Sequence, residues 1–210
     1  MTPKFISHPD FASLEPFWVY HKQHDKMNFS HPEELLNKHI IYRRKAAFGP
    51  FQRAVLKISA DDYYKLYING EYVTEGPASA YHMHYQYNEL DITKYLTQGE
   101  NTFAVLTYYH GTVCNSFVSG DLRQMLWFDL ALDGETVLVS DESWRCGYHT
   151  GYTACGRFGY DVAFAERYDA GDPNTFFYKP GFDDSSFGYA AENRHAQWGY
   201  PPAFHRYQRT

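Results

Sequence analysis

The alternation of apolar and polar side chains predicts β-strands along most of this chain. In the segment YYKLYI, residues 63–68, every second side chain from Tyr64 onward is apolar or aromatic and falls on one face of a strand. Asn69-Gly70 follows at once and indicates a hairpin, because a type I′ turn needs positive φ at both central positions. Residues 71–74 then predict the returning strand.

The same pattern recurs at short intervals, between turns rich in Gly, Asn and Asp. It predicts further strands at residues 40–48, 53–58, 102–109, 124–132, 136–139 and 160–168. Asp133-Gly134 is a second hairpin signal, and Asp91 is a cap for one helical turn over residues 92–96. Many short strands with such turns are typical of a β-sandwich rather than of βαβ units.

Both ends of the chain lack this alternation. Residues 1–38 are irregular and aromatic, with a short helix predicted at 32–38 after Ser30 or His31. The other end is rich in Phe, Tyr, Pro and Gly, and its Pro201-Pro202 pair cannot lie in a central strand.

We therefore predict an all-β fold, an antiparallel β-sandwich of the jelly-roll or galactose-binding-like kind. The sandwich is expected at residues 39–172, with an irregular N-terminal extension at 1–38. A C-terminal extension at 173–210 is expected to lead to a following domain that this sequence lacks.

Net charge and hydropathy narrow the classes of partner. The 210 residues carry 19 Lys and Arg against 25 Asp and Glu, a net charge of −6, which argues against nucleic acid and against an anionic membrane surface. No run of about 18 apolar residues predicts a membrane span. The N-terminus does not read as a signal peptide, so the chain as written is expected to be cytoplasmic, or periplasmic or secreted if a signal was removed.

Aromatic residues make up 19% of the chain, and tyrosine both packs on pleated sheets and stacks on sugar rings. The loop at residues 77–87 is especially rich in them, and the strand ending near residue 110 is expected beside it. Aromatic faces there would stack on a pyranose while imidazole and phenol groups bond its hydroxyls. The candidate carbohydrate-binding residues are Tyr81, His82, His84, Tyr85, Tyr109 and His110. The alternative is a structured loop that docks on a neighbouring domain.

The sequence predicts no catalytic residue. A glycosidase needs two carboxylates across the scissile bond, whereas Asp61-Asp62 and Asp183-Asp184 are sequence neighbours whose side chains point apart, as in turns. We interpret both pairs as turn residues.

The metal and disulfide signals are equally weak. His82-Met83-His84 resembles half of a zinc or copper site, and we predict no metal from it. Cys114, Cys146 and Cys155 contain no CxxC motif; Cys146 and Cys155 would pair only in an oxidising compartment.

Several motifs, in order, resemble the N-terminal β-sandwich region of bacterial α-L-rhamnosidases, which are glycoside hydrolases. The resemblance spans roughly residues 40–191. The motifs are SADDYYKLYINGEYVTEGP at 59–77, YQYNELDITKYLTQGENTFAV at 85–105, DESW at 141–144, ERYDA at 166–170 and GFDDSSF at 181–187. Phe187 stands where that family usually has Trp.

This resemblance implies a non-catalytic module, because the family's catalytic carboxylates lie in a separate helical domain C-terminal to the sandwich. The implied partners are that catalytic domain, in the same polypeptide, and a rhamnose-containing glycan. Some sandwiches of these enzymes hold rhamnose through calcium; here the loop at 78–88 offers only Asn88, so no cofactor is predicted and calcium stays open. The alternatives are a free-standing lectin-like module and a purely structural interdomain scaffold.

Overall fold

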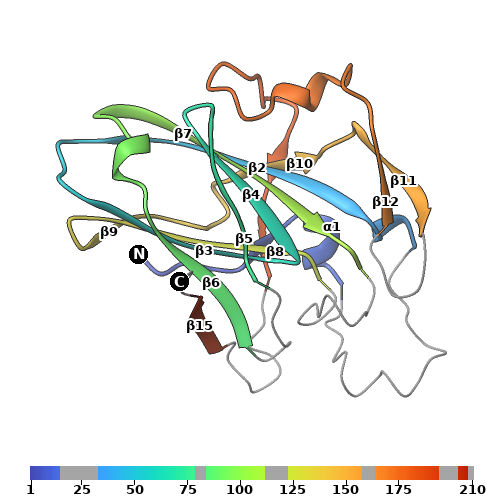
Figure 1. Ribbon diagram of the computed structural model, residues 1–210, viewed down its shortest axis with the longest axis horizontal. Helices are drawn as coiled ribbons and strands as arrows, with labels where there is room; N and C mark the ends of the chain where they lie inside the picture. The colour runs from blue at the N-terminus through green and yellow to red at the C-terminus, as the bar shows by residue number, and fades with distance from the viewer. Residues whose placement is uncertain (15–32, 79–83, 112–122, 158–163, 194–202, 208–210) are drawn as a thin grey trace.

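The computed structural model describes residues 1–14, 33–78, 84–111, 123–157, 164–193 and 203–207. Within these ranges the chain forms two facing sheets with a two-stranded ribbon beside them (Figure 1). The predicted all-β sandwich is thereby confirmed. The finer jelly-roll or galactose-binding-like topology stays a prediction.

The first sheet is seven-stranded. Its order is β14 (Ala191–Glu192), β1 (Ile6–Ser7), β8 (Met125–Leu132), β3 (Ala54–Asp61), β6 (His84–Asp91) and β15 (Ala203–Tyr207), with β9 (Glu135–Val139) also paired to β8. The β6–β15 pair is parallel, whereas the other described pairs of this sheet are antiparallel.

The second sheet is six-stranded and wholly antiparallel over its described pairs. Its order is β13 (Gly188–Tyr189), β10 (Arg145–Tyr148), β2 (Lys38–Phe48), β7 (Gly99–Tyr109), β4 (Tyr63–Ile68) and β5 (Glu71–Gly76). The ribbon consists of β11 (Tyr152–Arg157) and β12 (Phe164–Tyr168).

The helical elements of the described ranges are each a single turn. They are α1 (Pro9–Ala12) and three 3₁₀ turns, η1 (Glu33–Leu35), η2 (Thr93–Tyr95) and η3 (Pro173–Phe176). None of these helices is long and apolar enough to cross a membrane. The helix predicted at residues 32–38 is seen as the single turn η1, and it is shorter than predicted because Asn37 turns the chain at φ 53° and β2 pairs with β7 from Lys38 onward.

The main core fills the space between the sheets, since alternate side chains of each strand face the opposite sheet. Phe103 of β7 and Phe128 of β8 meet there, with ring centroids 5.5 Å apart. Trp144 of the DESW motif is fully buried beside Phe128 and donates its indole N–H to the carbonyl of Val139 at 2.9 Å. The apolar alternation of the sequence therefore corresponds to this interface.

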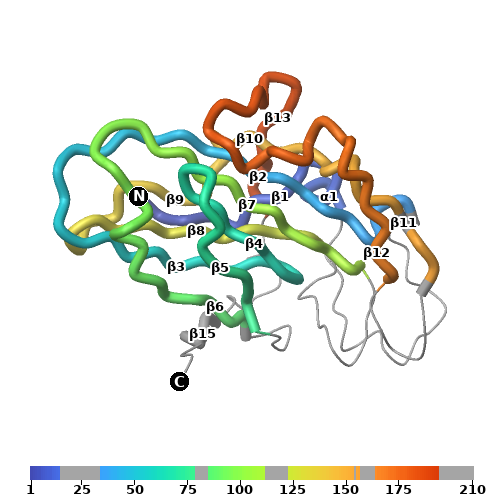
Figure 2. Tube along the Cα trace, turned by 45° about the horizontal axis from the view of Figure 1, so that its top comes forward, coloured from blue at the N-terminus to red at the C-terminus, as the bar shows by residue number. Residues whose placement is uncertain are grey.

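The outer face of the six-stranded sheet is covered as well. Phe177 and Phe187, from the segment after the ribbon, pack against Ile41 of β2 in a second apolar cluster. Figure 2 shows this segment passing over β10 and β2.

Both chain ends take part in the sheets, although they were predicted as irregular extensions. β1 lies between β8 and β14, and Phe11 of α1 is fully buried with its ring edge against Tyr109 at 5.0 Å. The segment after residue 173 supplies β13 to one sheet and β14 to the other.

Most predicted strands match β2, β3, β4, β5, β7, β8 and β9 within a few residues. The strand predicted at 160–168 is seen from Phe164, and its first four residues lie outside the described ranges. The Asn69-Gly70 turn has the predicted positive φ values, 53° and 89°. Asn69 also donates its side-chain amide to the Tyr95 carbonyl at 2.9 Å, so the hairpin is tied to η2.

Candidate functional site

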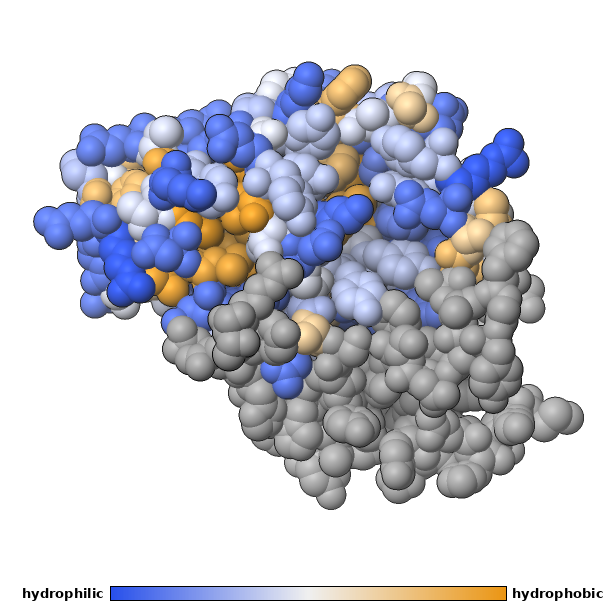
Figure 3. Space-filling model, in the orientation of Figure 1, coloured by the Kyte–Doolittle hydropathy of each residue, from blue (hydrophilic) through white to orange (hydrophobic). Residues whose placement is uncertain are grey.

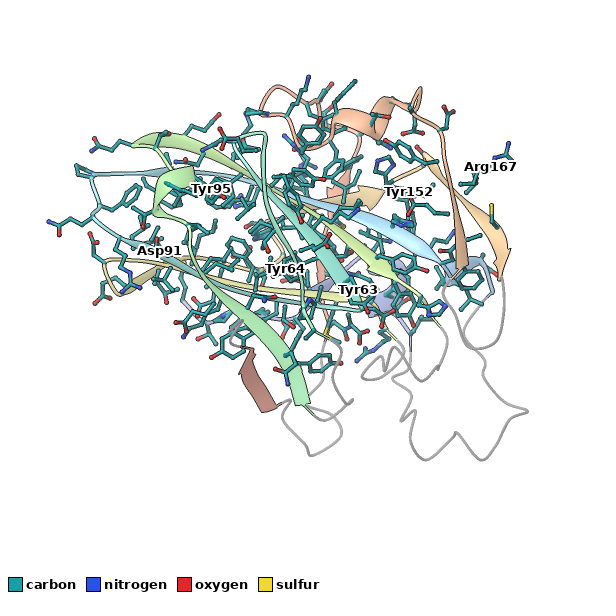
Figure 4. The ribbon with its side chains drawn as sticks, in the orientation of Figure 1. Tyr63, Tyr64, Asp91, Tyr95, Tyr152 and Arg167 are labelled. Atoms are coloured by element: carbon teal, nitrogen blue, oxygen red, sulfur yellow. The ribbon has the colours of Figure 1, made fainter. Side chains whose placement is uncertain are left out.

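A pocket of about 440 Å³ opens on the outer face of the six-stranded sheet, where β2, β4 and β7 meet the ribbon. Its size is within the range of about 300–1,000 Å³ that is usual for ligand sites. In Figure 4, Tyr63 lies at the start of β4, and Tyr152 and Arg167 lie on the ribbon. Outward-facing strand positions thus supply the floor of the pocket and the ribbon supplies one wall.

Stacked rings form the aromatic part of the pocket. His39 of β2 lies flat on Tyr152 of β11, with ring centroids 3.7 Å apart and planes 9° apart. Tyr108 of β7 packs against the same imidazole at 4.7 Å. Burial, followed by the neighbouring His149 and Lys65, lowers the pKa of His39 to about 3, so its imidazole is neutral at physiological pH. Burial, then Glu166, raises the pKa of Tyr152 to about 12, so its phenol stays protonated.

Four charged side chains surround the aromatic part: Lys65 of β4, Glu75 of β5, and Glu166 and Arg167 of β12. All four are exposed. Lys65 and Glu75 are direct cross-strand partners. Over the described residues, none of the four side chains makes a hydrogen bond or ion pair. Two positive and two negative side chains therefore lie at the rim of one pocket, and their polar atoms can form hydrogen bonds with a ligand.

Three of the six predicted carbohydrate-binding residues are buried, and the side chains of the other three lie outside the described part of the structure. Tyr85, Tyr109 and His110 are 5%, 1% and 0% exposed, and the Tyr85 hydroxyl donates to buried Asp61 at 3.2 Å. Little of these three rings is exposed in this structure. Tyr81 and His82 lie outside the described residues, and for His84 only the backbone, in β6, is described. Carbohydrate binding at all six residues stays a prediction.

The Asp61-Asp62 pair is not a solvated turn, contrary to the interpretation from sequence. Asp61 is 2% exposed, and Asp62 accepts the backbone N–H of His110 at 2.7 Å. Burial raises the pKa of Asp62. The bond between His110 and Asp62 connects the end of β7 to the β3–β4 connection. It joins two residues that are 48 positions apart in the sequence.

No group of three or more His, Cys, Asp or Glu side chains in the described residues is placed to hold a metal ion. Asn88, the residue considered for calcium, accepts the Tyr64 hydroxyl at 2.7 Å and so bonds within the fold. Cys146 and Cys155 are both free thiols, and burial raises the pKa of Cys146 to about 12.

The sequence alone did not indicate His39, Tyr108 and Tyr152 as pocket residues. One signal was present: Tyr63, Lys65 and Tyr67 occupy the face of β4 opposite the apolar one, and such tyrosines on a polar face are unusual on a solvated sheet. The ribbon that completes the pocket pairs Tyr152 with Tyr168, and its two strands do not alternate clearly in sequence.

Solved structures of two rhamnosidases and a lectin have a similar fold. A rhamnosidase of glycoside hydrolase family 78 from Bacillus sp. GL1 matches with a TM-score of 0.75 and 24% identity, over 98% of this chain and 20% of that one. An α-L-rhamnosidase from Dictyoglomus thermophilum matches with a TM-score of 0.65 and 20% identity, over 99% and 22%. A Pleurotus ostreatus lectin in complex with GalNAc matches with a TM-score of 0.55 and 16% identity, over 96% and 46%.

The chain thus spans about a fifth of the length of the two rhamnosidases. No curated protein matches it in sequence. The sequence pattern of the α-L-rhamnosidase N-terminal domain matches residues 49–199, which include every element from β3 to β14. This match covers well over half of the chain. It includes all five motifs that carried the resemblance, from residue 59 to residue 187. The chain belongs to the α-L-rhamnosidase N-terminal domain family.

Proposed function

We propose that this chain is the non-catalytic β-sandwich module of an α-L-rhamnosidase-like glycoside hydrolase. In that enzyme it supports the catalytic domain of the same polypeptide and contacts rhamnose-containing glycans. The observation that carries the proposal is the family match over residues 49–199. Because a β-sandwich hosts many functions, the fold alone would not carry it.

The carboxylates of the pocket favour binding over catalysis. A glycosidase keeps its general acid protonated by burying it, and positions a second carboxylate across the glycosidic bond. Glu75 and Glu166 are the carboxylates that line the pocket, and both are exposed. They are suited to accepting hydrogen bonds from sugar hydroxyls.

The surface favours a supporting contact with another domain. Among the described strands, β5 forms an edge of the six-stranded sheet. Figure 3 shows apolar surface gathered between β5 and β6 on the face turned to the viewer. Val73 of β5 and Leu90 of β6 are half-buried at the margin of the core. An apolar area beside the edge of a sheet is typical of a surface that packs against a neighbour.

An assay of this chain on an aryl α-L-rhamnoside tests the non-catalytic role. We expect no turnover above the buffer rate. Hydrolysis that persists through purification and is lost in Glu75→Gln or Glu166→Gln would refute that role, because it would place the chemistry in this pocket.

The lectin-like alternative is favoured by one observation, the similarity to the Pleurotus ostreatus lectin over 96% of this chain. Calorimetric titration with L-rhamnose, first with calcium and then with chelator, separates the candidates. Saturable heat supports glycan contact by the module, and its loss in chelator would assign the contact to a metal-bridged site. A flat titration in both conditions leaves the scaffold role alone.

A further inference from the structure

A row of tyrosines continues from the pocket across the outer face of the six-stranded sheet. Tyr152 of the pocket contacts Tyr168 of β12, with ring centroids 4.8 Å apart. Tyr67 of β4 stacks on Tyr178 at 4.9 Å and meets Tyr72 of β5 at 5.7 Å. We call these five residues the tyrosine row.

The two halves of the row are joined at Tyr67. The Phe177 ring lies against Tyr67, with ring centroids 5.5 Å apart, and His149 lies between Phe177 and Tyr168, at 5.6 Å and 5.7 Å. On β4, Tyr67 shares one face with the rim residue Lys65, and the two are paired with Tyr72 and Glu75 of β5. Pocket and row are therefore one continuous surface rather than two separate sites.

Part of the row is open to solvent. Tyr72 is 51% exposed and Tyr168 is 39% exposed, and both are among the large hydrophobic side chains that the fold leaves outside its core. A row of phenols presents ring faces for apolar C–H surface and hydroxyls for hydrogen bonds. A pyranose offers both kinds of surface, since its C–H face is apolar and its edge carries hydroxyls.

The charges beside the row favour an uncharged ligand. The pocket rim carries Lys65 and Arg167 against Glu75 and Glu166, so its formal charges cancel. His39 adds none, because its imidazole is neutral above about pH 3. An anion would gain from two of the rim groups and be repelled by the other two, and the same holds for a cation.

We propose that the pocket and the tyrosine row bind one neutral oligosaccharide, with one pyranose in the pocket and the next stacked along the row. This inference rests on the proposed glycan contact. It adds where the glycan binds, that the site takes at least two linked sugar residues, and that the glycan is uncharged. The pocket supplies hydrogen bonds from the rim, and the row supplies stacking for the second residue.

Calorimetric titration of the 210-residue chain with L-rhamnose and with a trisaccharide of α-linked L-rhamnose tests the length. We expect the trisaccharide to bind about tenfold tighter, as one added stacking contact gives. Tyr72→Ala should remove this gain and leave the affinity for L-rhamnose unchanged. Arg167→Ala should weaken both ligands, because it alters the pocket itself. A trisaccharide that carries a uronic acid should bind no better than L-rhamnose.

Tyr189→Ala is the matched control. Tyr189 is 55% exposed, on β13 at the opposite edge of the sheet, where it stacks on Arg145 at 4.1 Å. We expect this variant to bind both ligands as the parent chain does, and thermal melts should show all three variants folded. Equal affinity for the two neutral ligands, or the same result for Tyr72→Ala and Tyr189→Ala, overturns the inference.

Failure of the oligosaccharide site and failure of the proposed non-catalytic role give different experimental results. If neither neutral ligand binds, the oligosaccharide site is refuted and the row is a face for another domain. The turnover assay still decides the non-catalytic role in that case.

Discussion

Arg43 joins the outer segment of the molecule to the six-stranded sheet. Its side chain is 1% exposed and pairs with Asp184, Nε to Oδ2 at 2.9 Å. It also donates to the carbonyls of Phe177 and Lys179 and lies over the Phe182 ring at 5.1 Å. A buried guanidinium with several acceptors is stabilising only while those acceptors stay in place.

Replacing this residue measures how strongly it holds the segment. Arg43→Met should lower the free energy of unfolding by about 2–4 kcal/mol, because Asp184 and the carbonyls lose a largely buried donor. Urea denaturation monitored by fluorescence gives the change.

Lys45→Met is the control for that variant. Lys45 lies two positions along β2 and makes an exposed pair with Glu100 at 3.1 Å, with both side chains about half exposed. We expect Lys45→Met to lower the free energy of unfolding by less than about 1 kcal/mol. Similar losses in the two variants would show that Arg43 does no more than a surface ion pair.

Residue-level interpretation from sequence succeeded where the partner was local. Asp183 accepts the backbone N–H of Ser185 at 3.0 Å, the turn contact that its position beside Ser185-Ser186 indicated. Asp184, in the same dipeptide, instead meets Arg43 across 141 positions. Composition and spacing contain no information about such a distant partner, so the second role was not predictable.

At the scale of elements, β10 is packed on one face by an aromatic ring of the outer segment. Gly147 faces the ring of Phe187, and a Cβ built on Gly147 would come within 2.7 Å of that ring. Phe187 lies in the GFDDSSF motif, where the family usually has Trp. Because Gly147 has no side chain, the Phe187 ring of the outer segment can pack against β10.

Gly147→Ala tests this packing. We expect a loss of about 1–3 kcal/mol in the free energy of unfolding, because the added methyl must displace a buried ring. Gly188→Ala on the adjacent strand β13, where no atom lies within 4 Å of the new Cβ, should be nearly neutral. Combining Gly147→Ala with Phe187→Leu should recover part of the loss; additive losses in this double-mutant cycle would contradict the contact.

Elements with a strong local pattern were predicted, and short ones were not. β4, its turn and β5 follow from the alternation and from Asn69-Gly70. β10 and β13 span four and two residues, too few for a period to be seen. They are strands because β10 pairs with β2, and β13 pairs with β10.

At the scale of the whole molecule, the first residues of the chain belong to the core. Phe11 is fully buried, although it lies in a segment without a strand or helix pattern. β1 pairs with β14 near the other end of the chain, with Ile6 opposite Glu192. Lys4 and Glu192 add an ion pair at 2.8 Å. β14 and β1 therefore form one edge of the seven-stranded sheet together.

Phe11→Ala should lower the free energy of unfolding by about 3–5 kcal/mol, as expected for a deleted core ring. Thermal and urea unfolding both report the loss. Phe176→Ala is the control, since Phe176 is 53% exposed, and should cost less than about 1 kcal/mol. A loss for Phe11→Ala as small as that of the control would show that the N-terminal segment only rests on the surface.

The sequence by itself determined the fold class, most of the long strands, both hairpin turns and, through its motifs, the family. These follow from local rules, because a period of two and a positive φ are properties of a few neighbouring residues. Only the tertiary structure decided which aromatic residues stay outside the core. Tyr109 and Tyr108 are neighbours on β7, yet the pleat sends the first into the core and the second to the pocket. The pocket also needs His39 and Tyr152 side by side, across 113 positions, and only the pairing of the strands sets that distance.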